Sequence, residues 1–168
     1  MRNSLDTLLL DSKIFVDANI FLYAILGHPA LKPRCQKFLF KIENSQYKAM
    51  TSSLVLNEVM HKLMLTEAVR TYELSSERDA LKLIKEKLEL ISNMSLVWEN
   101  YSELKKYPIT IFSIDEEALD MAVLLSRKYG LLISDAVHAA IMKINSIDNI
   151  ATNDGDFERI EGITVWKP

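Results

Sequence analysis

Short apolar runs bounded by turn-forming residues recur along the chain, and each predicts a buried β-strand. The first run is rich in β-branched and aromatic residues and ends at Asp17. The predicted strands cover residues 14–16, 48–51, 109–114, 149–152 and 163–166.

Between these runs, apolar residues recur at helical spacing. Gly27 to Pro29 ends the first helical pattern, and Gly130 closes a later one that Asp115 can cap. The predicted helices cover residues 19–26, 31–42, 74–101 and 115–129, and two more begin after Ser52 or Ser53 and at Ser134.

Residues 74–101 have a strongly amphipathic pattern and predict one long helix. Its apolar face consists of Leu81, Ile84, Leu88, Ile91 and Trp98. This face either packs on the core of the same domain or forms an interface with another chain. Trp98 and Tyr101 are of residue types enriched in interface cores.

Strands that alternate with helices predict an α/β fold with a mostly parallel sheet. The 168 residues have the length of one domain and contain no repeat or low-complexity tract. We therefore expect a single domain over residues 1–168, with a long helical segment at about 74–106. In such folds ligands bind beyond the carboxyl ends of the strands.

Composition narrows the functional classes. Hydrophobic residues make up 49% of the chain and the net charge is −3, which argues against a broadly basic nucleic-acid-binding surface. Cys35 is the only cysteine, so an intrachain disulfide and a cysteine zinc site are excluded. Because no apolar run reaches the ~18 residues of a membrane span, and the stretch at 8–10 is too short for a signal peptide, we expect a cytoplasmic protein.

Four acidic residues lie where predicted strands end or inside the helices that follow: Asp17, Glu58, Asp135 and Asp154. A carboxylate at the end of a buried strand is costly unless another group offsets its charge. Carboxylate oxygens are the ligands that Mg²⁺ and Mn²⁺ prefer. The pattern therefore indicates a shared divalent-cation site.

Each acid also has a plain structural explanation. Asp17 can cap a helix, Glu58 can be solvated, and Asp135 suits the positive end of a helix dipole. Asp154 and Asp156 lie in NDGD, a sequence that also suits an ordinary turn. The metal hypothesis depends on all of them meeting at one edge of the sheet.

The segments that carry these acids are FVDANIFLYAI at 15–25, SSLVLNEV at 52–59, ISDAVHAA at 133–140 and ATNDGDF at 151–157. In order and setting they resemble the PIN-domain family and, within it, the VapC-like ribonuclease toxins. The resemblance runs from about residue 14 to the end. It departs from a compact toxin in the 77 positions between Glu58 and Asp135, which include the long helical segment.

The resemblance implies a three-layer α/β/α sandwich and cleavage of RNA that depends on Mg²⁺ or Mn²⁺. The implied catalytic residues are Asp17, Glu58, Asp135 and Asp154, the implied metal ligands are Asp17, Asp135, Asp154 and Asp156, and the implied supporting residues are Asn19, Thr152 and Asn153. Whether Asp154 or Asp156 is the main fourth acid stays open. The resemblance also implies a homodimer and an antitoxin protein as partner.

Candidates for binding RNA phosphates are basic residues near these segments. Arg34, Lys37 and Lys41 share one predicted helix face, and Lys62 lies near Glu58. Such charges are commonly just solvated. His138 and His61 each follow an acid by three residues and could support that acid as an outer partner, although a structural role is the more common one for such histidines.

Two other functions remain open. A phosphohydrolase could use Asp17 as a covalent nucleophile, although that chemistry usually needs a second aspartate where this chain has Asn19. A non-catalytic interaction module could keep the same fold and even bind a metal.

Overall fold

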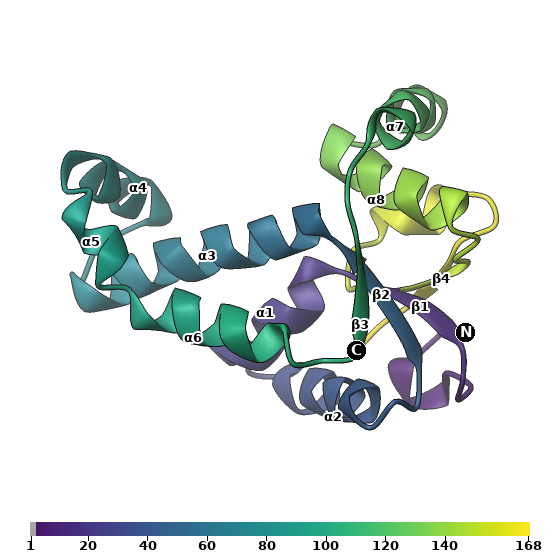
Figure 1. The fold of residues 1–168 in the computed structure, drawn as a ribbon, viewed down its shortest axis with the longest axis horizontal. Coiled ribbons are helices and arrows are strands. Elements are labelled where there is room, and N and C mark those ends of the chain that lie inside the picture. Colours follow the sequence, from purple (N-terminus) through teal and green to yellow (C-terminus); the bar gives the residue numbers. More distant parts are fainter. Residues whose placement is uncertain (1–2) are drawn as a thin grey trace.

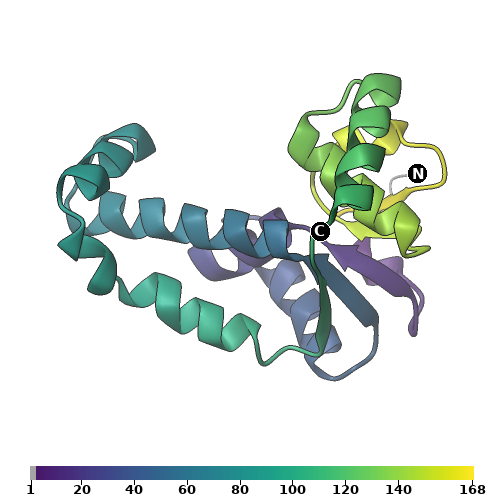
Figure 2. The same cartoon turned by 45° about the horizontal axis from the view of Figure 1, so that its top comes forward.

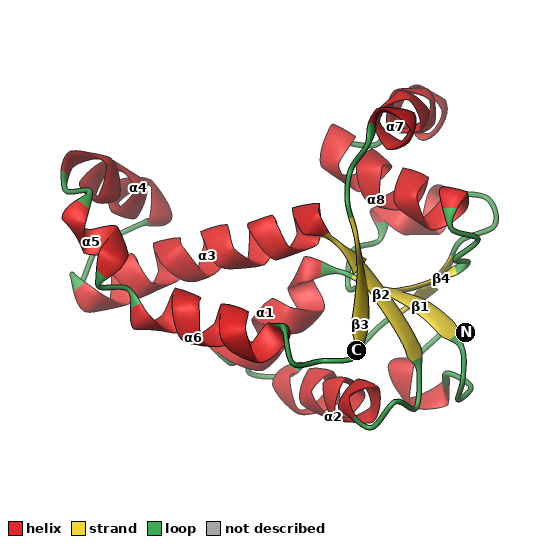
Figure 3. Ribbon diagram, in the orientation of Figure 1, coloured by secondary structure: helices red, strands yellow, loops and turns green. Residues whose placement is uncertain are grey.

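The computed structural model describes residues 3–168 and contains one five-stranded parallel sheet in the order β3-β2-β1-β4-β5 (Figure 3). The strands are β1 (Lys13–Val16), β2 (Lys48–Ser52), β3 (Ile109–Phe112), β4 (Asn149–Ala151) and β5 (Thr164–Trp166). In the centre of the sheet, Phe15 pairs with Met50 on one side and with Ile150 on the other.

Helices cover both faces of the sheet. They are α1 (Ala18–Leu26), α2 (Lys32–Glu43), α3 (Ser53–Thr71), α4 (Glu77–Glu86), α5 (Glu89–Ser92), α6 (Ser95–Leu104), α7 (Glu116–Tyr129) and α8 (Ile133–Ile144), with short 3-10 helices at Leu5–Thr7 and Asp156–Arg159. Figure 1 shows α1 and α2 on one side of the sheet and α7 and α8 on the other. The predicted α/β/α sandwich is therefore confirmed.

Burial explains the short apolar run that begins the fold. Ile14, Phe15 and Val16 of β1 are fully buried because helices cover the central strand on both faces. The edge strand β3 has no fully buried residue. A central strand buried on both faces reads as a continuous apolar run without alternation, which is the pattern at 14–16.

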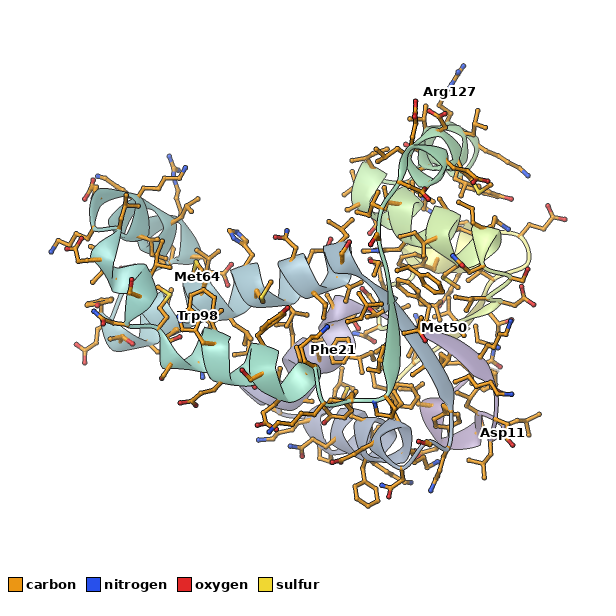
Figure 4. The ribbon with its side chains drawn as sticks, viewed as in Figure 1. Asp11, Phe21, Met50, Met64, Trp98 and Arg127 are labelled. Atoms are coloured by element: carbon orange, nitrogen blue, oxygen red, sulfur yellow. The ribbon has the colours of Figure 1, made fainter. Side chains whose placement is uncertain are left out.

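The second half of α3 and the helices α4 to α6 form an arm that projects from the sheet (Figures 1 and 2). Helices α4 and α6 pack against α3. Side chains fill the space between α3 and α6 around Met64 and Trp98 (Figure 4).

The prediction of one helix over residues 74–101 is wrong, because the backbone leaves the helical conformation at Lys87, where ψ is 74°, and again at Met94, which is extended with a ψ of 112°. A single helix of roughly 28 residues would be about 42 Å long and would carry the chain away from the sheet. The predicted apolar face is divided accordingly. Ile84 is buried, whereas Leu88 is 66% exposed.

Most predicted helix ends are confirmed. Ser52 accepts a hydrogen bond from the Val55 amide and caps α3, and Asp115 caps α7 in the same way. Gly130 ends α7 with a φ of 64°, a left-handed conformation that suits glycine. The predicted Ser134 cap is wrong, because α8 begins at Ile133 after Leu132 without a side-chain cap. No helix within residues 3–168 is long and apolar enough to cross a membrane.

Candidate metal centre

The predicted acids meet at the carboxyl ends of β1 and β4. These two strands are neighbours, and the strand order reverses between them, since β2 and β3 lie on one side and β4 and β5 follow on the other. Asp17 directly follows β1, and its backbone amide donates to the carbonyl of Ala151 at the end of β4. Such a reversal point is where open α/β sheets bind their ligands.

Asp17 is buried, with 7% of its surface exposed, and hydrogen bonds hold its carboxylate in place. Its Oδ1 accepts from the Ala18 amide at 2.6 Å, which makes Asp17 the N-cap of α1. Its Oδ2 accepts from Asn19 Nδ2 at 2.5 Å and from Thr152 Oγ1 at 2.6 Å. Burial raises the pKa of this carboxyl, while the bond from Thr152 and the proximity of His138 act in the opposite direction.

Asn19, Thr152 and Asn153 link the loop after β4 to the start of α1. Thr152 Oγ1 donates to Asp17 and accepts from Asn19 Nδ2 at 2.8 Å and from the Asp154 amide at 3.0 Å. Asn19 Oδ1 accepts from the Asn153 amide at 3.1 Å. The position of Asp154 is thus tied to that of Asp17 through one hydroxyl group.

Glu58 and His138 approach Asp17 from two helices on opposite sides of the sheet. Glu58 lies in the second turn of α3, and His138 follows Asp135 by one helical turn on α8. His138 Nε2 is 3.4 Å from Glu58 Oε2. One potential ligand atom from each of Asp17, Glu58 and His138 lies within 4.8 Å of the other two.

Asp135, Asp154 and Asp156 form a second, more open group whose carboxylate oxygens lie within 4.8 Å of one another. Asp154 Oδ1 accepts from the Asp156 amide at 2.8 Å. Asp156 also forms an ion pair of 2.7 Å with Arg159 Nη2. Because Arg159 offsets the negative charge of Asp156, Asp154 is the acid of this loop whose negative charge is less neutralised.

The two groups act as one electrostatic site. Burial raises the pKa of Asp135, and the charges of Asp154, Asp17 and Asp156 raise it further, while His138 lowers it. Mutual repulsion of this kind is relieved when a cation binds between the carboxylates. All of these aspartate and glutamate donors are oxygen atoms, so the residues present fit a hard divalent cation such as Mg²⁺ or Mn²⁺.

The predicted phosphate-binding residues have partners away from these acids. Lys37 pairs with Asp6 at 2.6 Å, Arg34 donates to the carbonyl of Pro168, and Lys41 lies beside the ring of Tyr47. Lys62 forms an ion pair with Glu77 at the start of α4. The structure therefore does not bring these four cations to the carboxylates.

Sequence reasoning did not assign a role in the site to two residues that the structure places there. The spacing of His138 from Asp135 leaves a role as an outer partner of the acids open but favours a structural histidine. Arg159 was not considered, although it follows Asp156 by three residues within a short 3-10 helix. In both cases the only sequence signal is the spacing from an acid.

Comparison with known proteins shows the family to which the chain belongs. The PIN domain family matches residues 14–163. Ribonuclease VapC6 of Methanocaldococcus jannaschii is 26% identical over 93% of this chain and 97% of its own length, and ribonuclease VapC2 of the same organism is 25% identical over 92% and 93%. A structure described as a toxin–antitoxin complex from Klebsiella pneumoniae has a TM-score of 0.58 at 16% identity and covers 89% of this chain and 94% of its own. Since the family match spans most of the chain, the protein belongs to the PIN domain family.

Proposed function

We propose that the protein is an endoribonuclease that depends on a divalent metal ion and hydrolyses phosphodiester bonds of RNA at this site. The observation that carries the proposal is the convergence of carboxylates from β1, α3, α8 and the loop after β4, where burial and the charges of neighbouring acids raise the pKa of Asp135. The names of the two archaeal relatives, both ribonucleases, support RNA as the substrate.

Mg²⁺ or Mn²⁺ is the proposed cofactor, held by Asp17, Asp135 and Asp154, with Asp156 as an additional acid. A bound cation would polarise the scissile phosphate and the attacking water and would stabilise the leaving oxygen. Asp17 is fixed by hydrogen bonds on both oxygens, which keeps its carboxylate in one orientation. Glu58 is half-buried beside Asp17, where its carboxylate can accept a proton from the attacking water.

The phosphohydrolase alternative loses support at position 19, where that chemistry usually needs a second aspartate. The amide of Asn19 donates a hydrogen bond to Asp17 Oδ2 and cannot act as a general acid for a leaving group. The non-catalytic alternative is disfavoured by the complete set of acids and by their mutual proximity.

The test is cleavage of single-stranded RNA by purified protein with Mg²⁺, with Mn²⁺ and with EDTA. Asp17→Asn should keep the fold and lose most activity, whereas Asp120→Asn, the same change at an exposed position on α7, should leave activity intact. Cleavage that survives EDTA, or full activity of a folded Asp17→Asn protein, would contradict the proposal.

We also propose that the protein is the toxin of a toxin–antitoxin pair. The support is that one structural neighbour is a toxin–antitoxin complex and that both archaeal relatives are VapC ribonucleases. A groove of about 390 Å³ between α1, α2 and α6 offers a place for the antitoxin, with Phe40 beside it 62% exposed and Glu43 and Glu103 on its rim. Expression of the protein should arrest growth, and the Asp17→Asn variant should not. Growth arrest by the inactive variant would separate toxicity from this site.

Self-association is proposed through α7 rather than through the arm. Exposed apolar side chains gather on α7 and at the start of α8: Leu119, Val123, Leu124, Leu132 and Ile133. A second copy of the chain is the proposed occupant of this face. Sedimentation should show a dimer that Val123→Glu dissociates and that Leu88→Glu, an exposed change on the arm, leaves intact. A monomer at every concentration would refute the dimer.

A further inference from the structure

His138 is a buried polar residue, and one of its ring nitrogens has no partner among residues 3–168. Only 2% of its surface is exposed, and its ring lies 5.7 Å from that of Phe15, centroid to centroid. Within the described part of the chain, Nδ1 is buried and has no hydrogen-bond partner. The other nitrogen, Nε2, points toward the carboxylates and lies 3.4 Å from Glu58 Oε2.

These surroundings distinguish the two tautomers of the ring. A hydrogen on Nδ1 would be a buried donor without an acceptor, which is unfavourable because the N–H group loses its hydrogen bond to water and gains none from the residues that the structure describes. It would also leave Nε2 with a lone pair directed at the negative carboxylate of Glu58. A hydrogen on Nε2 avoids both penalties, because Nδ1 then carries only a lone pair among apolar neighbours and Nε2 has an acceptor within reach.

We propose that His138 is a positioning residue that donates a hydrogen bond from Nε2 to Glu58 Oε2 and so holds this carboxylate beside Asp17. The role rests on the proposed function in so far as Glu58 works in the metal-dependent reaction. The separation of 3.4 Å is long for an N–H···O bond, and bonds of this kind in ligand-free sites are commonly long and shorten in the working complex.

The need for such a donor follows from the fold. Glu58 belongs to α3 on one side of the sheet, and the other acids are carried by β1, α8 and the loop after β4. Asp17 is fixed by three donors, from Ala18, Asn19 and Thr152, whereas His138 is the polar group that α8 supplies to Glu58. A donor on α8 fixes the distance between the α3 acid and Asp135, which lies one turn earlier on α8.

The inference separates His138 from the metal ligands. A nitrogen that carries a hydrogen cannot bind a cation, so the donors to the metal are oxygen atoms only. If Nε2 were a ligand, the hydrogen would have to move to Nδ1, where no acceptor is present within the described residues. Ligating histidines almost always donate their other N–H to a partner.

Substitutions separate the donor from the bulk of the ring. His138→Leu keeps an apolar side chain of similar size and removes the donor that holds Glu58 beside the ligand Asp17. Glu58 is an outer partner of the cation rather than one of its ligands, and a disturbed outer partner should weaken Mn²⁺ binding by about 10–100-fold. His138→Gln places an amide N–H near the position of Nε2 and should retain most of the affinity. His61→Leu is the matched control, because His61 follows Glu58 by three residues on α3 but is exposed.

The decisive experiment combines ¹⁵N NMR of the histidine rings of the full chain with Mn²⁺ titrations of the variants. We expect hydrogen on Nε2 and a bare Nδ1 at His138, unchanged by Mg²⁺, and metal affinities in the order wild type, His138→Gln, His138→Leu. Hydrogen on Nδ1, loss of the Nε2 hydrogen on addition of Mg²⁺, or equal affinity of a folded His138→Leu protein would each overturn the proposal.

Two further comparisons test the role of His138 if the first experiments cannot. If His138→Leu fails to fold, His138→Asn replaces it, because the shorter amide cannot reach Glu58 as that of Gln can, and equal affinities of the Asn and Gln variants would overturn the proposal. If wild-type protein binds no Mn²⁺, the metal-dependent function fails, while the NMR spectrum still decides which nitrogen is the donor.

Discussion

Replacement of Asp135 by asparagine should stabilise the metal-free protein and destabilise it relative to wild type when metal is bound. Asp135 lies in the first turn of α8, within 4.8 Å of carboxylate oxygens of Asp154 and Asp156. Asparagine has nearly the same shape but no charge. The substitution therefore removes repulsion without opening a cavity.

The size of the effect follows from two opposing interactions. Unit charges 4.8 Å apart repel by about 0.9 kcal/mol in water and by about 3.5 kcal/mol at an effective dielectric constant of about 20. Asp135 is half-buried, so we take about 2 kcal/mol for its repulsion from Asp154, and we neglect Asp156 because Arg159 compensates it. The favourable interaction of the carboxylate with the α8 dipole, about 0.3–1 kcal/mol, is lost. The net stabilisation is about 1 kcal/mol, or roughly 2–4 °C in melting temperature.

Metal should reverse this order. Mn²⁺ at about 100 times its Kd stabilises a folded protein by about 2.7 kcal/mol, and a variant that lacks a ligand gains much less. The assay is thermal melting of wild type, Asp135→Asn and Asp120→Asn, each with EDTA and with Mn²⁺. Asp120→Asn, an exposed change on α7, should follow the wild type in both conditions.

Two results would refute the reasoning. A metal-free melting temperature of Asp135→Asn at or below that of wild type would show that repulsion does not dominate at this position. An equal shift with Mn²⁺ in both proteins would exclude Asp135 as a ligand.

Three further predictions concern pH, the Thr152 hydroxyl and the arm. The pKa values of Asp17 and Asp135 are raised, so the folded state binds protons more tightly than the unfolded chain. The stability of the metal-free protein should therefore fall as pH rises from about 4 through the raised pKa values, and thermal melts across pH should show a smaller fall for Asp135→Asn. Thr152→Val removes a donor to the buried Asp17 carboxylate and should lower the free energy of unfolding by about 1–3 kcal/mol in denaturant titrations, and no change would contradict the network. In the arm, Ile84→Ala should lower the free energy of unfolding by about 2–4 kcal/mol, and the exposed Leu88→Ala should lower it by less than about 0.5 kcal/mol. Similar losses in the two variants would support one continuous amphipathic helix instead of the observed breaks.

Local chemistry explains which parts of the fold could be predicted from the sequence. The central strand was predictable because burial on both faces requires an uninterrupted apolar run at 14–16. The caps at Ser52 and Asp115 were predictable because each side chain bonds an amide three residues on. The position of Asp17 and Asp154 at the carboxyl ends of neighbouring strands was predictable because all strands of a parallel sheet run in the same direction.

The features that sequence reasoning missed depend on contacts between distant residues. The breaks at Lys87 and Met94 turn the arm back toward β3, and no proline or glycine marks them. The amphipathic pattern continues through both breaks, so periodicity alone predicted one helix. The partner of Lys37 is Asp6, 31 positions earlier, and the burial of His138 depends on β1 and α3. Such pairings follow from packing rather than from local spacing.

The ends of the RNA products test the central claim most directly. A water molecule that attacks phosphorus at a carboxylate-held cation leaves a 5′-phosphate and a 3′-hydroxyl. The account predicts these ends in the presence of Mg²⁺ or Mn²⁺, no products with EDTA, and none from folded Asp17→Asn protein. Products with 2′,3′-cyclic phosphate ends, formed equally with EDTA, would show that the four carboxylates are not the catalytic site.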